Sequence, residues 1–476
     1  DQDIGGYHLI WPRDMVQAAM GKLACGDAVS ARRAWFYLTC TQEQQGNWTQ
    51  NMWLDGTPNW TGIQMDATGY GILLADALRR AGEFESHTDW QAVRKAAGFL
   101  VRNGPVTDQE RWEENAGYSP NTMAIEVAAL LAAADFAEQH KQTGMAEFLS
   151  ATADAWNEAI DELTYADGTE LAREFEVDGY YIRIAPREAI ETGLQESTTI
   201  RLKNLPDEDR EKRAPDVISP DALSLVRFGL RAANDPRIVA TVKLIDALTR
   251  TETSAGPVWR RYTGDGYGES ADGSPFRDRG QGRGWPLLAG ERAHYEIACG
   301  NLREAKRLAR VIAAQTSECG LIPEQVWDAA DLPERELWNG RPTGSGMPLV
   351  WAHAELIKLL RSIRERKIWD MPPQPVERYQ KQKKTANFQI WTKSQQRRHL
   401  KRGKALRVDL PEAARIRWST DDWQTTQECE TTDSQLGLHY AVLPVADAAP
   451  GTQIRFTFYW TERKEWEGQN FEVNTL

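Results

Sequence analysis

Two acidic segments of this sequence contain the residue types that cleavage of a glycosidic bond requires. Trp112-Glu113-Glu114-Asn115 places adjacent carboxyl groups beside a tryptophan at a predicted helix entrance, and Glu324 lies in the segment Pro323–Asp328. Such cleavage needs one carboxyl group that protonates the leaving oxygen and another that attacks the sugar or activates water. Burial and mutual repulsion can separate the pKa values of two such groups. Each segment alone also fits a simpler role, because acidic residues near a helix N-terminus complement the helix dipole.

A third segment, Trp11-Pro12-Arg13-Asp14, contains residues that could hold a sugar. The guanidinium of Arg13 offers several donors and the Asp14 carboxylate accepts two hydroxyl hydrogens, so the pair could clamp adjacent hydroxyls of one pyranose. A structural ion pair is the alternative. The chain also has 19 Trp residues, whose clusters lie next to Asp, Glu, Arg and Gly. Indole faces cover the C–H faces of sugar rings, so this pattern favours a carbohydrate site over a Trp-rich core.

Apolar residues at i, i+3 and i+4 spacing predict eleven helices up to about residue 366. The helices form pairs, and a polar, aromatic-rich loop precedes the first helix of nearly every pair. Six such loops predict a closed (α/α)6 toroid, which needs twelve helices, so the first helix is expected to be missing. An open α-solenoid is the alternative, although no repeat consensus is found. The predicted helices are 14–26, 28–44, 64–82, 88–103, 119–140, 142–162, 219–233, 235–250, 284–299, 302–316 and 344–366.

Residues 165–214 interrupt the helical pattern. The stretch LAREFEVDGYYIRIAP reads as two short strands around Asp178-Gly179, a hairpin turn signal. A charged stretch, KNLPDEDREKR, follows it and is expected to be a solvated loop. This excursion is either a wall of the active site or a structural insertion.

After residue 369 the pattern changes from helices to strands. The polar, basic segment 370–385 is predicted to be a surface linker. Beyond it, ALRVDL, ARIRWST, HYAVLP and TQIRFTFYW alternate apolar and polar residues, as half-buried strands do. We therefore predict a mainly α chain with three parts: a catalytic toroid over 1–369, a linker over 370–385 and a small C-terminal β-sandwich over 386–476.

Composition excludes several other classes of protein and site. A net charge of −12 argues against a nucleic-acid partner, which requires a basic surface. No apolar run is long enough for a membrane span, and the opening DQDIGGYHLIWPRD lacks the features of a signal peptide. The five Cys residues contain no CxxC pair, so no metal site of the zinc type is predicted, and most of them are expected to be small core residues.

The segments above, in order along residues 5–366, resemble glycoside hydrolase family 15, the family of glucoamylases and bacterial glucodextranases, and its bacterial branch in particular. WPRD, RWEE and PEQVWD together are much more specific than any one of them alone. The resemblance is carried by GGYHLIWPRD, NMWLDGTPNWTGIQMD, RWEENAGYSP, ISPDALSLVRFGLRAA, WRRYTGDGYGE, GRGWPLLAGERAHYE, GLIPEQVWD and GRPTGSGMPLVWAHAE.

The resemblance implies the (α/α)6 fold and the release of single glucose units, as β-glucose, from non-reducing ends of α-glucans. By position, Glu113 matches the general acid and Glu324 the general base, which inversion places roughly 6.5–9.5 Å apart. Arg13 and Asp14 match the pair that holds the terminal glucose, and Glu114 matches a contact to the leaving sugar. The implied substrate-binding residues are Tyr7, Trp11, Arg13, Asp14, Trp60, Trp112, Glu114, Arg261 and Trp285.

The chemistry of this family requires no metal or organic cofactor. A structural Ca2+ would suit an extracellular glucan hydrolase, but no DxDxDG loop marks a site for it. The polymer substrate and the family imply an extracellular or periplasmic location. Bacterial members usually carry an N-terminal β-sandwich and then the first helix, so an N-terminal segment or companion chain is expected to complete the toroid.

Several alternatives remain open at this stage. A same-family transglucosidase, a trehalose-cleaving member and an inactive glucan-binding protein fit the same segments. Preference for α-1,4 or α-1,6 linkages depends on the site for the leaving sugar, built partly from residues 165–214. In the C-terminal domain, Trp418, Trp423, Tyr459, Trp460 and Trp466 either form a glucan-binding surface or pack a core.

Overall fold

The computed structural model describes residues 8–83 and 87–476 of the chain. All eleven predicted helices are present, with ends shifted by a few residues. The seventh is much shorter than predicted, because it ends before Gly229, whose φ of 78° is left-handed and whose Cβ position lies 2.6 Å from Val376 Cγ2. The eleven are α1 (Pro12–Ala24), α2 (Ala28–Thr41), α3 (Met65–Arg80), α4 (His87–Asn103), α5 (Pro120–Gln139), α6 (Thr143–Thr164), η4 with α9 (Pro220–Leu223, Ser224–Arg227), α10 (Pro236–Leu248), α11 (Pro286–Ala298), α12 (Leu302–Ala314) and α13 (Val350–Glu365).

Six of these helices form a closed inner ring. Going round the ring, α1, α3, α5, α9, α11 and α13 each pack against the next, and α13 packs against α1. Helices α2, α4, α6, α10 and α12 lie outside them. Within residues 8–83 and 87–476 the outer layer thus has five long helices, as predicted. The N-terminal segment or companion chain stays a prediction.

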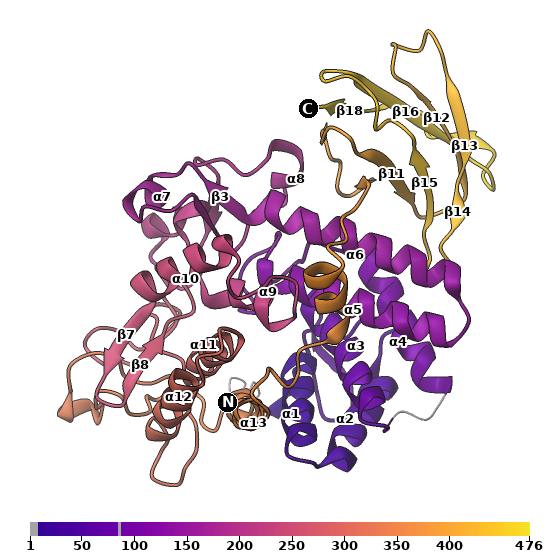
Figure 1. The fold of residues 1–476 in the computed structure, drawn as a ribbon. Coiled ribbons are helices and arrows are strands. Elements are labelled where there is room, and N and C mark those ends of the chain that lie inside the picture. The colour runs from indigo at the N-terminus through magenta and orange to yellow at the C-terminus, as the bar shows by residue number, and fades with distance from the viewer. Residues whose placement is uncertain (1–7, 84–86) are drawn as a thin grey trace.

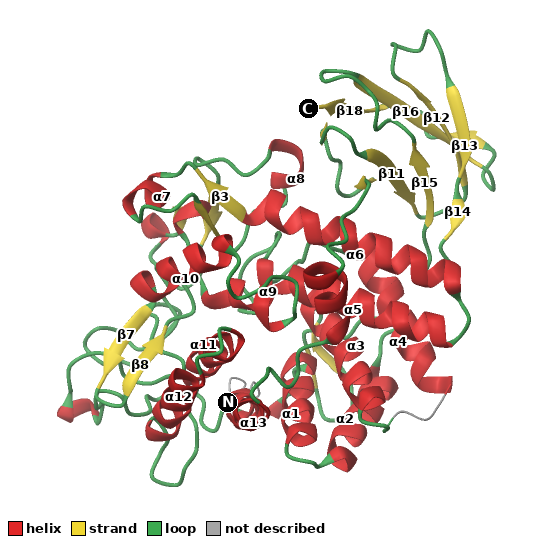
Figure 2. Ribbon diagram, in the orientation of Figure 1, coloured by secondary structure: helices red, strands yellow, loops and turns green. Residues whose placement is uncertain are grey.

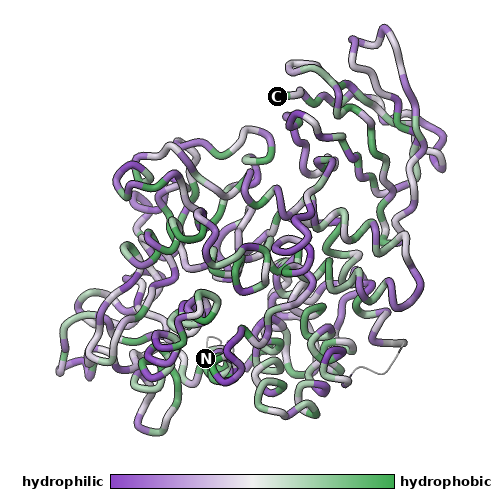
Figure 3. The backbone as a smooth tube through the Cα atoms, in the orientation of Figure 1, coloured by the Kyte–Doolittle hydropathy of each residue, from purple (hydrophilic) through white to green (hydrophobic). Residues whose placement is uncertain are grey.

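Close approach between the inner helices depends on small residues. A Cβ on Gly69 of α3 would lie 2.7 Å from Ile125 Cγ2 of α5, and one on Gly21 of α1 would lie 2.9 Å from Ala354 Cβ of α13. A side chain at either position would collide with the neighbouring helix, so glycine permits the close packing. Helix α5 is buried on almost all sides, as expected of an inner helix. Figure 3 shows hydrophobic stretches along the helices and strands, while many connecting loops are hydrophilic.

Glu126 of α5 is a buried carboxyl group without a hydrogen-bond partner among the described residues. Burial raises its pKa well above the ordinary value, and the nearby Asp66 adds to the rise. The folded protein therefore keeps Glu126 protonated at a pH where the unfolded chain ionises it. The free energy of unfolding is therefore highest, as far as Glu126 is concerned, below the unfolded pKa of about 4.5. It falls as the pH rises from there toward the folded pKa.

Replacing Glu126 by Gln is expected to stabilise the protein relative to wild type by an amount that grows as the pH rises from 4.5 to 7.5. A neutral amide does not have to take up a proton on folding. Thermal unfolding at several pH values measures the difference, with Glu138→Gln, exposed near the end of the same helix, as the control. A difference that stays constant with pH would contradict the assignment.

The excursion differs from the predicted hairpin. Residues Glu170–Glu174 form a short helix, α7, and the turn at Asp178-Gly179 leads into a strand that pairs back to residue 165. The prediction was wrong because Leu171 and Ala172 pack as a helical turn capped by Thr169. The small elements are β1 (Asn51–Met52), β2 (Pro58–Trp60), β3 (Tyr165–Asp167), β4 (Gly179–Tyr181), α8 (Ala189–Thr192), β5 (Thr199–Arg201), η2 (Asp207–Asp209), β6 (Glu211–Arg213), η3 (Ala214–Asp216), β7 (Arg250–Thr253), β8 (Gly256–Trp259) and η5 (Pro333–Arg335).

The C-terminal region consists of two sheets, as predicted. One has the order β10-β18-β16-β12-β13, with β17 paired to β16, and the other has the order β14-β15-β11-β9. Figure 1 shows them stacked beside α6. The strands are β9 (Phe388–Thr392), β10 (His399–Leu400), β11 (Ala405–Leu410), β12 (Ala414–Ser419), β13 (Gln427–Glu430), β14 (Thr432–Asp433), β15 (His439–Leu443), β16 (Gln453–Trp460), β17 (Glu465–Trp466) and β18 (Phe471–Thr475).

Two of the five aromatics considered for glucan binding are core residues of the sandwich. Trp418 and Trp460 are buried among its aliphatic and aromatic side chains. Trp466 is exposed, but Arg417 lies 4.7 Å from its ring centroid and Tyr459 meets it edge-on at 5.5 Å. The idea of a five-residue sugar surface is therefore wrong for Trp418 and Trp460.

The segment between the toroid and the sandwich lies against the helices. It contains α14 (Pro373–Pro375) and the π-helical turn η6 (Val376–Lys381). Asp370 pairs with Arg227 of α9 at 2.8 Å, and Arg378 pairs with Asp154 of α6 at 2.5 Å. The predicted division at 369 and 385 stays a prediction, but ion pairs hold the linker against the helices at its start and near its middle.

The cysteines do not fill the core as expected. Cys25, Cys40, Cys299 and Cys319 are exposed, and Cys429 is half-buried. None of the helices in the described part of the chain combines the length and hydrophobicity that crossing a membrane requires.

Candidate active site

The loop between α4 and α5 carries the first acidic segment. This acidic loop, residues 107–117, is closed at its base by two backbone hydrogen bonds of 3.0 Å between Thr107 and Gly117. Inside it, the buried Glu110 carboxylate accepts hydrogen bonds from the backbone N–H groups of Trp112 at 2.8 Å and Glu114 at 3.2 Å. Glu110 thus shapes the loop from within, and sequence reasoning missed it because it resembles any acidic loop residue.

Glu114 is fully engaged in a buried cluster. Its carboxylate accepts hydrogen bonds from Arg261 at 2.9 Å, Arg183 at 3.1 Å and the Tyr262 hydroxyl at 2.5 Å, and only 3% of the side chain is exposed. Burial alone would raise the pKa of Glu114, but the two guanidinium groups and the hydroxyl lower it below its usual value. Glu114 is therefore held as a carboxylate.

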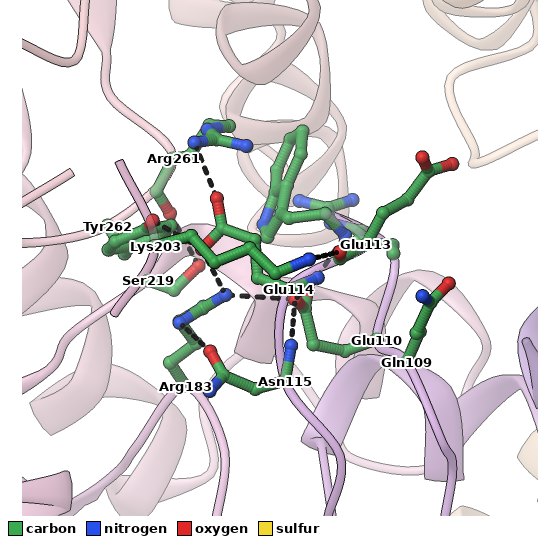
Figure 4. A network of polar contacts seen from close by, with 12 residues as sticks. Gln109, Glu110, Glu113, Glu114, Asn115, Arg183, Lys203, Ser219, Arg261 and Tyr262 are labelled. Carbon is green, nitrogen blue, oxygen red and sulfur yellow. Dashed lines mark hydrogen bonds and ion pairs between the residues drawn. The ribbon is translucent and has the colours of Figure 1, made fainter. Parts of the chain in front are cut away.

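Glu113 is placed differently from its neighbour. Its side chain is 24% exposed, and Figure 4 shows it pointing away from the cluster around Glu114. Its carboxylate accepts from Gln50 at 2.8 Å and from Arg13 at 3.4 Å. The backbone of Glu113 has a φ of 65°, a conformation that costs of order 1–3 kcal/mol for a residue with a side chain. This backbone turn sends the two adjacent carboxyl groups in different directions.

Arg13, at the start of α1, lies among several acceptors. Its guanidinium is 3.4 Å from Asp14, 3.8 Å from Asp66 and 3.0 Å from the Gln64 side-chain oxygen. Burial raises the pKa of Asp14, and Arg13 partly offsets the rise. Arg13 and Asp14 thus form the ion pair that was the alternative interpretation, and Arg13 also contacts Glu113, while their binding of glucose stays a prediction.

Aromatic rings connect the acidic loop to the toroid. Trp112 meets Trp285 edge-on at 5.2 Å and stacks on Trp351 at 6.4 Å. The Arg13 guanidinium lies 5.2 Å from the Trp351 ring, and Arg261 lies 5.3 Å from Trp112. Trp351 is the second residue of α13. It was not predicted as a site residue, although it lies within the motif GRPTGSGMPLVWAHAE.

Glu324 lies in a segment that converges on the same rings. It is 5% exposed, and its backbone N–H donates to Gly346 at 2.8 Å. The next side chain, Gln325, donates to the backbone oxygen of Tyr267 at 3.1 Å, and the Tyr267 ring lies 6.3 Å from Trp285. The acidic loop therefore contacts Trp285 directly through Trp112, and the Glu324 segment is linked to it through Tyr267.

Ion pairs fix the far end of the Glu324 segment. Asp328 accepts from Arg260 at 2.8 Å and from Arg283 at 3.1 Å. Arg283 also lies 4.0 Å from the Trp327 ring, and Gly284 and Val326 form a backbone bridge. The strand-like stretch that ends at Trp285 thereby holds the Glu324 segment in register.

The excursion forms one side of the site. Lys203 donates to the backbone oxygen of Glu113 at 2.6 Å, and Asn204 donates to Glu114 at 3.4 Å. Arg183 bridges Glu110 and Glu114, as Figure 4 shows. The sequence suggested a wall in this region, but it marked none of these three residues.

The remaining predicted site residues are less constrained. Tyr7 lies outside the described residues. Trp11 is the residue before α1, and its carbonyl accepts the N–H of Met15. Trp60 ends β2 with half of its side chain exposed, and its backbone N–H donates to Asn51 at 3.0 Å. Their roles stay predictions. No cluster of three or more His, Cys, Asp or Glu suited to a metal occurs in the described part of the chain.

Comparisons with known proteins agree on one family. A family model described as Glycosyl hydrolases family 15 matches residues 38–361. A glucoamylase from Clostridium sp. (strain G0005) is 40% identical over 382 residues, which cover 80% of this chain and 50% of that protein. The crystal structure of a bacterial glucoamylase complexed with acarbose has a TM-score of 0.70 at 39% identity, covering 79% of this chain and 52% of that one.

A more distant structure supports the fold alone. The structure named Glycosidase Wild Type has a TM-score of 0.54 at 17% identity, with 76% of this chain and 89% of that chain covered. This chain spans about half the length of the Clostridium glucoamylase and of the bacterial glucoamylase crystal structure. The family match ends at residue 361, before the C-terminal sandwich.

Proposed function

Because this chain belongs to glycosyl hydrolases family 15, we propose that it is an inverting, exo-acting hydrolase that releases β-glucose from the non-reducing ends of α-glucans. The observation that carries the proposal is the contrast between Glu113 and Glu114. Glu114 is held as a carboxylate by two arginines, whereas Glu113 is accessible and contacts Arg13. Of the two, Glu113 is the carboxyl group that a bound substrate can reach.

In the proposed mechanism, protonated Glu113 gives its proton to the glycosidic oxygen as the bond from that oxygen to C1 breaks. Glu324 removes a proton from water, and the oxygen of that water forms the new bond to C1 on the opposite face of the ring. The two carboxyl groups must then lie roughly 6.5–9.5 Å apart. After the products leave, Glu324 releases its proton to solvent and Glu113 takes one up, which restores the starting state. The proposed steps use no metal or organic cofactor.

The same proposal assigns the other residues of the site. Arg13 and Asp14 hold the hydroxyls of the terminal glucose, which restricts the site to chain ends. Trp112, Trp285, Trp11 and Trp60 line the pocket. Arg261 and Glu114, which Asn204 of the excursion also contacts, border the position of the leaving sugar. A polymeric substrate places the enzyme outside the cytoplasm, where a structural Ca2+ could bind without a part in the chemistry.

Proton NMR of the first minutes of reaction tests the proposal. Maltotriose and isomaltotriose are compared in separate reactions, because the anomeric proton of fresh glucose reports the stereochemistry before mutarotation. We expect early β-glucose from at least one of them, and the faster substrate identifies the preferred linkage. Early α-glucose would contradict inversion, and longer oligosaccharides without free glucose would indicate a transglucosidase.

A further inference from the structure

A single side chain of the C-terminal sandwich holds both ends of the acidic loop. Gln395 lies in the turn after β9, and 8% of it is exposed. Its amide nitrogen donates to the carbonyl oxygen of Gly104 at 2.9 Å, and its amide oxygen accepts from the Tyr118 hydroxyl at 3.3 Å. Gly104 lies just before the acidic loop and Tyr118 directly after it. The orientation of the amide is settled, because a carbonyl oxygen only accepts.

The two contacts of Gln395 are made to the stems of the acidic loop, which are the residues just before and just after it. Tyr118 is completely buried, and its backbone exchanges hydrogen bonds of 2.8 and 2.9 Å with Ala185 of the excursion. A Cβ on Gly117 would collide with the Ala185 carbonyl oxygen, so this stem has no free space. On the Gly104 side, the excursion contributes an exposed ion pair between Arg187 and Asp108. Gln395 adds a second tie between the two stems, one side chain away from the Thr107–Gly117 backbone hydrogen bonds.

Gln395 is itself held firmly by its surroundings. Its backbone exchanges hydrogen bonds of 3.2 and 3.3 Å with Thr392, which closes a tight turn. Next to this turn, the buried Arg397 pairs with Glu162 of α6, and Gln389 donates to the same carboxylate at 2.8 Å. The turn is therefore anchored to the toroid by charge-assisted contacts, which exceed neutral hydrogen bonds in strength.

We propose that Gln395 is a positioning residue, through which the C-terminal sandwich sets the placement of Glu113 by clamping the stems of the acidic loop. The kinetic part of this inference rests on the proposed function. Without the amide, the Tyr118 hydroxyl and the Gly104 carbonyl lose their partner in a buried place, and the loop can relax. A displacement of about 1 Å at a catalytic group is enough to lower the rate about 100-fold.

The test compares Gln395→Leu, which keeps the size of the side chain, with Gln396→Leu. Gln396 is the next residue and is exposed, and its side chain donates to the backbone oxygen of Lys393 within the same turn, so it controls for the substitution itself. We expect Gln395→Leu to lower kcat on maltotriose at least about tenfold with KM changed less than about threefold, and to alter the pH profile of kcat. Tyr118→Phe removes only the hydroxyl that Gln395 accepts from, and it is expected to change kcat in the same direction. It replaces Gln395→Leu in the test if that variant does not fold.

Hydrogen exchange of the backbone amides gives a readout that does not depend on activity. In Gln395→Leu the amides of residues 107–117 are expected to exchange at least about tenfold faster, with those of α5 unchanged. A lower melting temperature with unchanged kcat, pH profile and loop exchange would show a merely structural role and overturn the proposal. An equal effect of Gln396→Leu would also overturn it. A wild-type protein that releases no glucose would instead contradict the proposed function, and the exchange result would still decide the role of Gln395.

Discussion

Glu113→Gln is expected to lose about 10²- to 10⁴-fold in kcat on maltotriose, the usual contribution of a general acid. Gln keeps the shape of the side chain, and so the neighbours Arg13 and Gln50, but it has no acidic proton to give to the leaving oxygen. Initial rates of glucose release measure the loss. Glu318→Gln is a matched control, because Glu318 is exposed and lies six residues before Glu324.

A second substrate identifies the role of Glu113. In α-glucosyl fluoride the leaving group departs as fluoride and needs no protonation, so Glu113→Gln is expected to keep most of the wild-type rate on it. The comparison separates loss of an acid from loss of binding, since both substrates share the terminal glucose. An equal loss on both substrates would rule out Glu113 as the proton donor, and no loss on either would remove it from the mechanism.

Glu324→Gln is expected to lower kcat by a similar factor, about 10²- to 10⁴-fold, on both maltotriose and α-glucosyl fluoride. Every turnover needs an activated water, whichever group leaves, and an amide cannot remove its proton. The paired measurement therefore gives opposite patterns for the two glutamates. If Glu324→Gln retained the fluoride reaction, then Glu324 would not be the base.

Folding of the variant must be separated from its chemistry. Gln325 and Asp328 hold the Glu324 segment through bonds to Tyr267 and to two arginines, and none of these bonds involves the replaced carboxylate. The melting temperature of Glu324→Gln is thus expected to stay close to that of wild type. A large fall in melting temperature would mean that the rate loss reflects damage to the segment.

Local patterns in the sequence were enough to predict the helices and most of the sandwich strands. The apolar spacing within residues 119–140 predicts a helix, and α5 forms over Pro120–Gln139. Alternation in TQIRFTFYW predicts a strand, and β16 alternates between buried and half-buried residues. The predicted hairpin around Asp178-Gly179 was wrong. The turn signal marks the start of β4 correctly, but a turn signal does not determine which strand pairs with it.

The sequence by itself determined the family, the order of the loops around the toroid and the identity of the acidic segments, because these depend on residue types and short spacings. Only the tertiary structure decided that Glu114 is tied up and Glu113 is accessible, since their difference comes from Arg183 and Arg261, far along the chain. The support from Gln395 is of the same kind: it joins residues separated by more than 270 positions. No local pattern records such contacts, because they exist only when distant segments have packed together.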